Sequence, residues 1–155
     1  MSVNGYERRR AALREKLAGV LEAVGFPHAI SRMYAALTMA PGEGLSTSEL
    51  ITELDISNAS VSNAMQFLVG VELVERYRVP GSREAHYRII KGVWGDVLAK
   101  KFTATGQMTA IVREAKTGTD SPAALERLGE MEDVYSFFEQ EFAAVMDRWN
   151  ERMGR

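Results

Sequence analysis

The sequence predicts a mainly α-helical protein that carries a small β-hairpin. Apolar residues recur at helical spacing over most of the 155-residue chain. Between residues 71 and 90 this spacing gives way to alternation with a period of two, which is typical of strands. Towards the C-terminus, apolar residues then follow a heptad pattern along one long segment. A chain of this length is expected to bury a substantial core.

Composition excludes several classes of protein. The chain has no cysteine, so it cannot use disulfides, thiolate metal sites or cysteine nucleophiles, and this suits a reducing cytoplasm. The first residues, MSVNGYERRR, are polar and basic, and no apolar segment of a signal peptide follows them. No stretch approaches the roughly 18 consecutive apolar residues of a membrane-spanning helix. We therefore expect a cytoplasmic protein that has no membrane partner.

Two helices are expected in the first part of the chain. The first covers residues 6–25, and its apolar positions fall on one stripe: Leu13, Leu17, Val20, Leu21 and Val24. Pro27 suits the first turn of the second helix. The apolar positions of this second helix are Ile30, Met33, Tyr34 and Leu37. The residues PGEG at 41–44 then indicate a loop.

A pair of short helices follows this loop. The residues STSE at 46–49 form a capping-box pattern, which predicts a helix that extends to about Leu54. Residues 55–57 form a turn, and Ser57 is the expected N-cap of a helix over residues 58–69. The buried stripe of this helix is expected to hold Val61, Ala64, Met65 and Leu68.

A β-hairpin is expected after the helix pair. Residues 71–79 and 84–90 alternate between apolar and polar side chains, with Pro80-Gly81-Ser82 as the turn between them. Arg83 lies at the tip of this hairpin. The order of helix, short helix, turn, helix and basic hairpin is that of a winged helix-turn-helix.

The second helix of the pair carries a face suited to reading DNA. Its exposed side chains are small and uncharged, and in this fold the helix lies in the major groove. Asn and Gln can bond adenine in bidentate fashion, and Ser can donate or accept. The predicted reading residues are Asn58, Ser60, Ser62, Asn63 and Gln66. The predicted hairpin contacts to phosphates or the minor groove are Arg76, Arg78 and Arg83, with Arg88 as a further candidate.

Two long helices are expected in the C-terminal third. The first covers residues 93–116, with Gly106 allowing a bend or a close contact, and the second covers residues 123–153 after a break with Ser121 as cap. The second carries an a/d heptad seam: Leu128, Met131, Tyr135, Phe138, Phe142, Val145 and Trp149. Such a stripe needs a partner. We expect a homodimer interface that includes Leu17, Val24, Tyr135, Phe138, Phe142, Val145 and Trp149; the alternative is three-helix packing within a monomer.

These expectations divide the chain into three regions. Residues 1–25 form an N-terminal dimerisation helix, residues 26–91 form the winged helix-turn-helix, and residues 92–155 form a C-terminal helical dimerisation region. Two such readers about 34 Å apart would match a pseudo-palindromic site.

A small-molecule effector and a metal or catalytic site were also considered from the residue types. Trp94, Phe102 and Met108 are candidate effector-pocket residues, because aromatic side chains can enclose quaternary ammonium groups. The alternative is that these side chains are simply core. His28 and His86 lie in different elements without further ligands, so no metal and no cofactor is expected. No nucleophile motif or phosphate-binding loop occurs, so we do not expect an enzyme.

The distribution of charge leaves a second function open. The net charge is −2, with 15 basic and 12 acidic residues in 1–119 and 4 basic and 9 acidic residues in 120–155. Residues 44–91 carry 5 basic and 6 acidic groups, so any surface for a polyanion must be assembled by folding. The alternative function is therefore a winged-helix module that contacts protein through its polar helix face and does not bind DNA.

One segment of the chain resembles a known family. Residues 45–89, LSTSELITELDISNASVSNAMQFLVGVELVERYRVPGSREAHYRI, resemble the MarR-type bacterial regulators, and the VS pair, the PGSR turn and the HYR return strand resemble their GbsR-like branch. The resemblance covers roughly residues 25–90. It implies a homodimeric transcriptional regulator, typically a repressor, that reads DNA with the residues named above. The chain departs from many family members because residues 56–68 hold no basic side chain. Affinity would then have to come from the wing, or from Arg8–Arg10 or Arg32.

Overall fold

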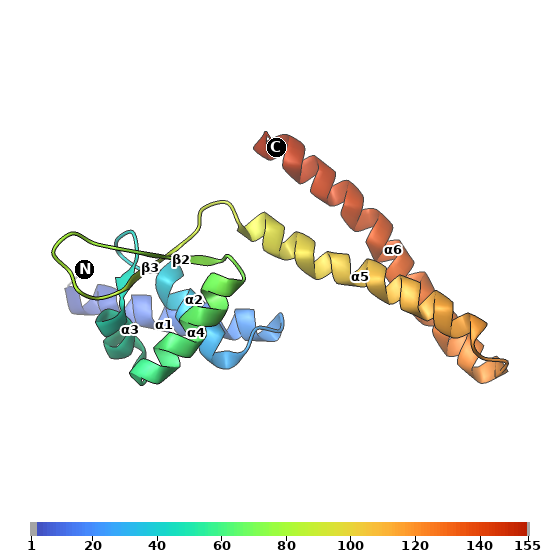
Figure 1. The fold of residues 1–155 in the computed structure, drawn as a ribbon, viewed down its shortest axis with the longest axis horizontal. Coiled ribbons are helices and arrows are strands. Elements are labelled where there is room, and N and C mark those ends of the chain that lie inside the picture. The colour runs from blue at the N-terminus through green and yellow to red at the C-terminus, as the bar shows by residue number, and fades with distance from the viewer. Residues whose placement is uncertain (1–2, 155) are drawn as a thin grey trace. The chain divides into compact units, whose positions relative to one another are not determined.

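The computed structural model describes residues 3–154, without the side chains of residues 3, 4, 101, 102 and 104. The chain forms two compact units, Met1–Lys91 and Gly92–Arg155 (Figure 1). Helices dominate both units, and the strands are short and lie in the N-terminal unit. The predicted fold class, mainly α with a small β wing, is confirmed.

Helices α1 (Val3–Ala23) and α2 (His28–Thr38) pack against each other in the N-terminal unit. Pro27 is the N-cap of α2 rather than a residue of its first turn. The buried face of α1 holds Arg14, Ala18 and Leu21. Most of the predicted apolar stripe lies elsewhere, and its exposed members are Leu13, Val20 and Val24. Periodicity identified the helix correctly, but it did not identify which side of the helix meets α2.

The helix pair forms as its capping signals predict. In α3 (Thr47–Leu54), the Glu49 N–H donates to Ser46 Oγ at 3.2 Å, and the Ser46 N–H donates to Glu49 Oε2 at 2.7 Å. This reciprocal capping box satisfies two N–H groups that the helix itself leaves unpaired. Helix α4 (Asn58–Gly70) begins where Ser57 Oγ accepts the Ser60 N–H. Its predicted buried stripe is confirmed: Val61, Ala64, Met65 and Leu68.

The wing belongs to a three-stranded antiparallel sheet. Strands β1 (Leu45–Ser46), β2 (Val74–Tyr77) and β3 (His86–Ile89) lie in the order β1-β3-β2. Leu45 pairs with Tyr87 in β1–β3, and Val74 pairs with Ile89 in β2–β3. The first strand was not predicted, and β2 is shorter than expected because residues just after α4 close its last turn, where Leu73 N–H donates to Leu68 O.

The C-terminal unit is an antiparallel pair of helices, α5 (Trp94–Thr117) and α6 (Pro122–Met153) (Figure 1). Ser121 Oγ caps α6 by accepting the Ala124 N–H, as predicted. Glu132 of α6 joins the two helices through Lys116 Nζ at 2.8 Å and Arg113 Nε at 2.7 Å. Hydrogen bonds from Lys116 and Arg113 hold the pKa of the Glu132 carboxyl below its usual range.

Gly106 allows the two helices of the C-terminal unit to approach closely. A Cβ at this position would lie 2.9 Å from the Glu139 carboxylate. Of the two roles considered for Gly106, the close contact is the one observed. Within the described residues, no helix has both the length and the apolar character needed to cross a membrane.

Candidate nucleic-acid interface

The exposed surface of α4 carries uncharged polar side chains together with the apolar Phe67 and Val69. Asn58, Ser62, Asn63 and Gln66 are all exposed; the last three lie away from the buried stripe that fixes α4 in the unit, and Asn58 is the first residue of the helix. Amide and hydroxyl groups on one exposed helix face can present both donors and acceptors to a patterned surface. The spacing of the residues along α4 sets this arrangement, so it was readable from the sequence.

Ser60 differs from the other predicted reading residues. It is half-buried, its N–H donates to Ser57 Oγ at 3.1 Å, and its hydroxyl lies 2.9 Å from the same oxygen. Its side chain therefore takes part in the N-terminal cap of α4. Its side chain is less exposed than those of Ser62 and Asn63.

The wing carries basic side chains that are exposed. The turn between its strands forms as predicted: the Ser82 N–H donates to Val79 O at 3.0 Å, and Gly81 has a φ of +85°. A positive φ after proline is the signature of a type II turn, where glycine is favoured. The basic side chains of β2 and the wing loop are exposed: Arg76, Arg78 and Arg83. Among the ion pairs of the described residues, none involves these three groups.

Arg88 is engaged within the sheet. Its Nε lies 2.7 Å from Glu75 Oε1, its Nη1 lies 3.2 Å from Glu43 Oε2, and its guanidinium lies 4.8 Å from the centre of the Tyr77 ring. The hydrogen bond to Glu75 raises the pKa of Arg88. Two carboxylates already offset this charge, which weakens its candidacy for a phosphate contact.

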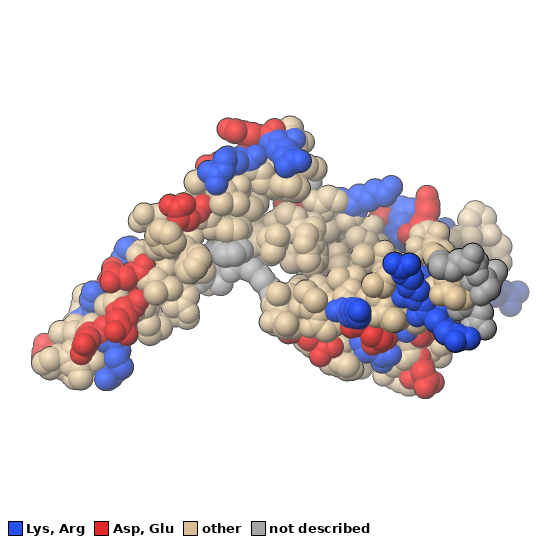
Figure 2. Space-filling model, turned by 180° about the vertical axis from the view of Figure 1, so that it is seen from behind, with Lys and Arg blue, Asp and Glu red and all other residues tan. Residues whose placement is uncertain are grey.

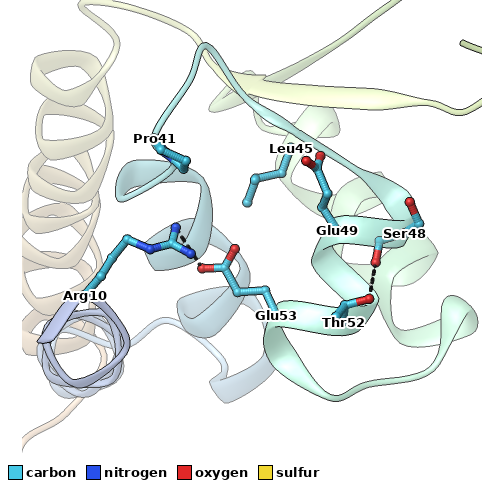
Figure 3. A pocket seen from close by; sticks show the side chains of 7 residues that line it. All are labelled: Arg10, Pro41, Leu45, Ser48, Glu49, Thr52 and Glu53. Carbon is cyan, nitrogen blue, oxygen red and sulfur yellow. Dashed lines mark hydrogen bonds and ion pairs between the residues drawn. The ribbon is translucent and has the colours of Figure 1, made fainter. Parts of the chain in front are cut away.

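Basic residues of α1 and α2 form contacts that hold the helices of the N-terminal unit together. Arg10 of α1 reaches Glu53 of α3 at 3.2 Å (Figure 3). Arg14 of α1 reaches the same Glu53 oxygen at 2.8 Å. Arg32 of α2 donates to the carbonyl of Leu54 at 3.1 Å and lies 3.4 Å from a Glu15 oxygen. Arg10 and Arg32 are therefore held by protein partners. Sequence reasoning missed the pair of Arg14 with Glu53, which lie far apart in the chain.

A shallow hollow opens beside this ion-pair cluster. Its volume is about 460 Å³, and Arg10, Glu49 and Glu53 contribute its charged groups (Figure 3). Each of these charges already has a partner, because Glu49 accepts the Ser46 N–H and Glu53 accepts from the arginines. The charged groups of the hollow are therefore already engaged by the protein itself.

The heptad seam of α6 consists of half-buried and exposed side chains. Leu128, Tyr135 and Phe142 are half-buried, whereas the intervening Met131, Phe138 and Val145 are exposed. Trp149 lies beside α5, where its Nε1 would contact a Cβ at Gly95, yet it stays 39% exposed. Across the described span Pro122–Met153, no residue of α6 is buried. Figure 2 shows charged side chains separated by uncharged surface along this unit.

Two of the three candidate effector residues lie far apart on α5. Trp94 and Met108 are exposed on α5 and stand about 21 Å apart along the helix axis. The side chain of Phe102 lies outside the described residues. A hollow of about 550 Å³ between α5 and α6 is lined by others, including Ala99, Gly106 and Met146. Among the described residues, no group of three or more carboxylates and histidines could hold a metal ion.

Known proteins resemble the chain in sequence and in fold. The family described as MmpR5-like MarR family transcriptional regulator matches residues 92–152. The HTH-type transcriptional regulator MmpR5 of Mycobacterium tuberculosis is 24% identical over 142 residues, which cover 90% of this chain and 86% of that protein. A crystal structure of a transcriptional regulator aligns with a TM-score of 0.70 at 21% identity, covering 92% of this chain and 99% of that one. These matches are to regulators rather than enzymes.

Proposed function

We propose that this MarR-like winged-helix transcriptional regulator binds a pseudo-palindromic operator in double-stranded DNA as a homodimer and represses transcription. The observation that carries the proposal is the pairing of an uncharged, exposed α4 face with a wing whose Arg76, Arg78 and Arg83 make no ion pair within the described residues. The GbsR-like branch is part of the proposal and rests on the sequence resemblance alone. The expected location is the cytoplasm.

Helix α4 supplies the base contacts in this proposal. Asn63 and Gln66 are exposed amides on the same helix face, and each can bond the N6 and N7 edge of adenine in the major groove. Their small neighbours, such as Ser62, allow the helix to approach the bases closely. No basic side chain stands on α4 to bind phosphates non-specifically, so this helix contributes discrimination more than affinity.

The wing supplies most of the electrostatic affinity. Arg76, Arg78 and Arg83 lie on β2 and the wing loop, and they are exposed and take part in none of the ion pairs found among the described residues. Guanidinium groups bind phosphate oxygens, and a narrow minor groove also attracts them. Arg10 and Arg32 of the N-terminal helices add less, because they are already held by Glu53, Glu15 and a backbone carbonyl.

Dimerisation is supported by apolar side chains that each unit leaves exposed. In α6, Phe138 is 50% exposed and Val145 is 45% exposed. In α1, Val20 is 61% exposed and Val24 is also exposed. Burying one such side chain stabilises an interface by roughly 1.5–3 kcal/mol, so a second copy that covers these stripes would gain substantial free energy.

Selection of bound duplexes from a random library tests the proposal. We expect an enriched pseudo-palindrome whose half-sites lie about one helical turn apart, and binding that weakens steeply as salt rises. Asn63→Ala should relax the selected sequence, whereas Arg83→Ala should weaken binding to all sequences alike. No enrichment at low or physiological salt would contradict DNA reading and favour the alternative, a winged helix that contacts protein.

A further inference from the structure

We propose that Glu84 is a positioning residue of the wing: its side chain fastens the wing loop to the first turn of α3 and so holds Arg83 in place to contact DNA. This inference rests on the proposed DNA binding. Glu84 itself would touch no nucleotide. It acts through Ser48, which lies far from it in sequence and next to it in the fold.

The contact between Glu84 and Ser48 has two parts. Glu84 Oε2 accepts the Ser48 hydroxyl at 2.7 Å and the Ser48 N–H at 3.3 Å. The N-terminal turn of a helix carries unpaired N–H groups and a partial positive charge, so a carboxylate is well suited to this place. The hydrogen bond from the Ser48 side chain is the main reason that the pKa of Glu84 lies below its usual range. The carboxylate is therefore ionised at neutral pH.

The same end of the loop is also held by its backbone. Thr47 N–H donates to Ala85 O at 3.0 Å, directly beside the Glu84 contact. Glu84 N–H donates to Ser82 Oγ at 3.2 Å, which closes the residues on either side of Arg83 into a short bend. Arg83 thus stands immediately before a point that is fixed by both side chain and backbone.

The rest of the wing loop has little to hold it. The described hydrogen bonds of residues 78–83 include the turn from Ser82 N–H to Val79 O, and the side chains of Arg78 and Arg83 are exposed. A long side chain on an exposed loop loses conformational entropy when it binds, and fixing the loop beforehand reduces that loss. The Glu84 contact would therefore raise the affinity that Arg83 provides.

A simpler role for Glu84 predicts the opposite effect on binding. If Glu84 were only an acidic side chain near the DNA, it would repel phosphates, and removing its charge would strengthen binding. If it positions Arg83, removing it weakens binding although a negative charge is lost. Ser48→Ala distinguishes the two roles further. It removes the hydrogen bond from the Ser48 hydroxyl to Glu84 without changing any charge.

The first experiment measures operator binding and its salt dependence for the full chain. Ser48→Ala and Glu84→Ala are each expected to weaken binding by about tenfold and to lower the salt slope by about one, as loss of one phosphate contact would. Glu84→Gln should lose less DNA affinity than Glu84→Ala, because its amide oxygen can still accept a hydrogen bond from the Ser48 hydroxyl. Thr52→Ala is the matched control, since its hydroxyl bonds only the Ser48 carbonyl within α3, and it should bind as the unaltered protein does.

A double-mutant cycle decides whether the effect passes through Arg83. Arg83→Ala should reduce DNA affinity much less in the Ser48→Ala variant than in the unaltered protein. The reason is that Ser48→Ala has already weakened the contact between Arg83 and DNA. Tighter binding by Glu84→Ala, or losses from Ser48→Ala and Arg83→Ala that simply add, would overturn the positioning role.

The second experiment needs no DNA. Amide hydrogen exchange across residues 78–85 should become faster in Ser48→Ala and in Glu84→Ala, and should not change in Thr52→Ala. Unchanged exchange in the first two variants would overturn the inference even if DNA binding is established. If exchange changes as expected but the unaltered protein binds no duplex, the proposed function fails and the positioning role fails with it, while the contact itself is verified.

Discussion

Glu53 is a position where replacing a single side-chain group should lower the free energy of unfolding substantially. Its Oε1 atom lies 2.8 Å from Arg14 Nη1 and 3.2 Å from Arg10 Nη1. The three side chains are 9%, 15% and 13% exposed for Arg14, Arg10 and Glu53. Glu53→Gln keeps the shape and can keep one oxygen towards both arginines, but it removes the negative charge that offsets them.

The expected magnitude follows from the burial of this cluster. Removing one partner of a buried ion pair costs about 3–5 kcal/mol, because the remaining charge is left without compensation. All three side chains keep some contact with water, and each arginine retains a second carboxylate, Glu15 for Arg14 and Glu7 for Arg10. We therefore expect a loss of about 3 kcal/mol, at the lower end of that range. With a urea slope of about 2 kcal/mol/M, the unfolding midpoint should fall by about 1.5 M.

Urea unfolding followed by circular dichroism measures this loss. Glu7→Gln is the matched control, because Glu7 pairs with the same Arg10 at 3.2 Å but is 53% exposed. An exposed pair of this kind contributes about 0–1 kcal/mol. Losses of similar size in both variants, or a loss below about 1 kcal/mol for Glu53→Gln, would refute the view that this cluster braces α1 against α3.

Three further predictions address the sheet, the dimer and the helical hairpin. Gly44→Ala should destabilise the N-terminal unit by about 1–3 kcal/mol, because the added Cβ would collide with a backbone carbonyl of β3. A Cβ at Gly42 would meet open space, so the melting temperature of Gly42→Ala should be unchanged. Phe138→Glu should halve the mass measured by light scattering, and Gln140→Glu, with the same charge on another side of α6, should leave it unchanged. Because the pKa of Glu132 is lower in the folded protein, its ionised carboxylate stabilises the fold at pH values above the unfolded pKa of 4.5. This stabilisation is lost as the pH falls through the lower folded pKa. Acid melts should therefore show a smaller fall in stability for Glu132→Gln than for the unaltered protein.

Local signals in the sequence determined the helix pair almost completely. The capping box of Ser46 and Glu49 and the cap at Ser57 act over three residues, so their geometry follows once the helix begins. The buried stripe of α4 follows from its 3.6-residue period, and the Pro80-Gly81 turn follows from the φ values those residues prefer. The exposed amide face of α4 was predictable for the same reason.

Contacts between distant segments were decided by the tertiary structure alone. Strand β1 exists because β3 lies beside it, and Leu45 and Ser46 by themselves carry no strand pattern. The pairing of Arg88 with Glu75 depends on strand register. Ser48 meets Glu84 because the sheet returns the chain to α3.

The buried sides of the long helices were likewise set by packing. In α1 the apolar residues occupy more than one face, and contact with α2 selected Ala18 and Leu21 while Val20 stayed exposed. In α6 the heptad pattern correctly marked an apolar stripe, but it could not assign half of that stripe to α5. Periodicity fixes the angle between side chains on one helix, whereas the face that becomes buried depends on where other segments of the chain come to lie.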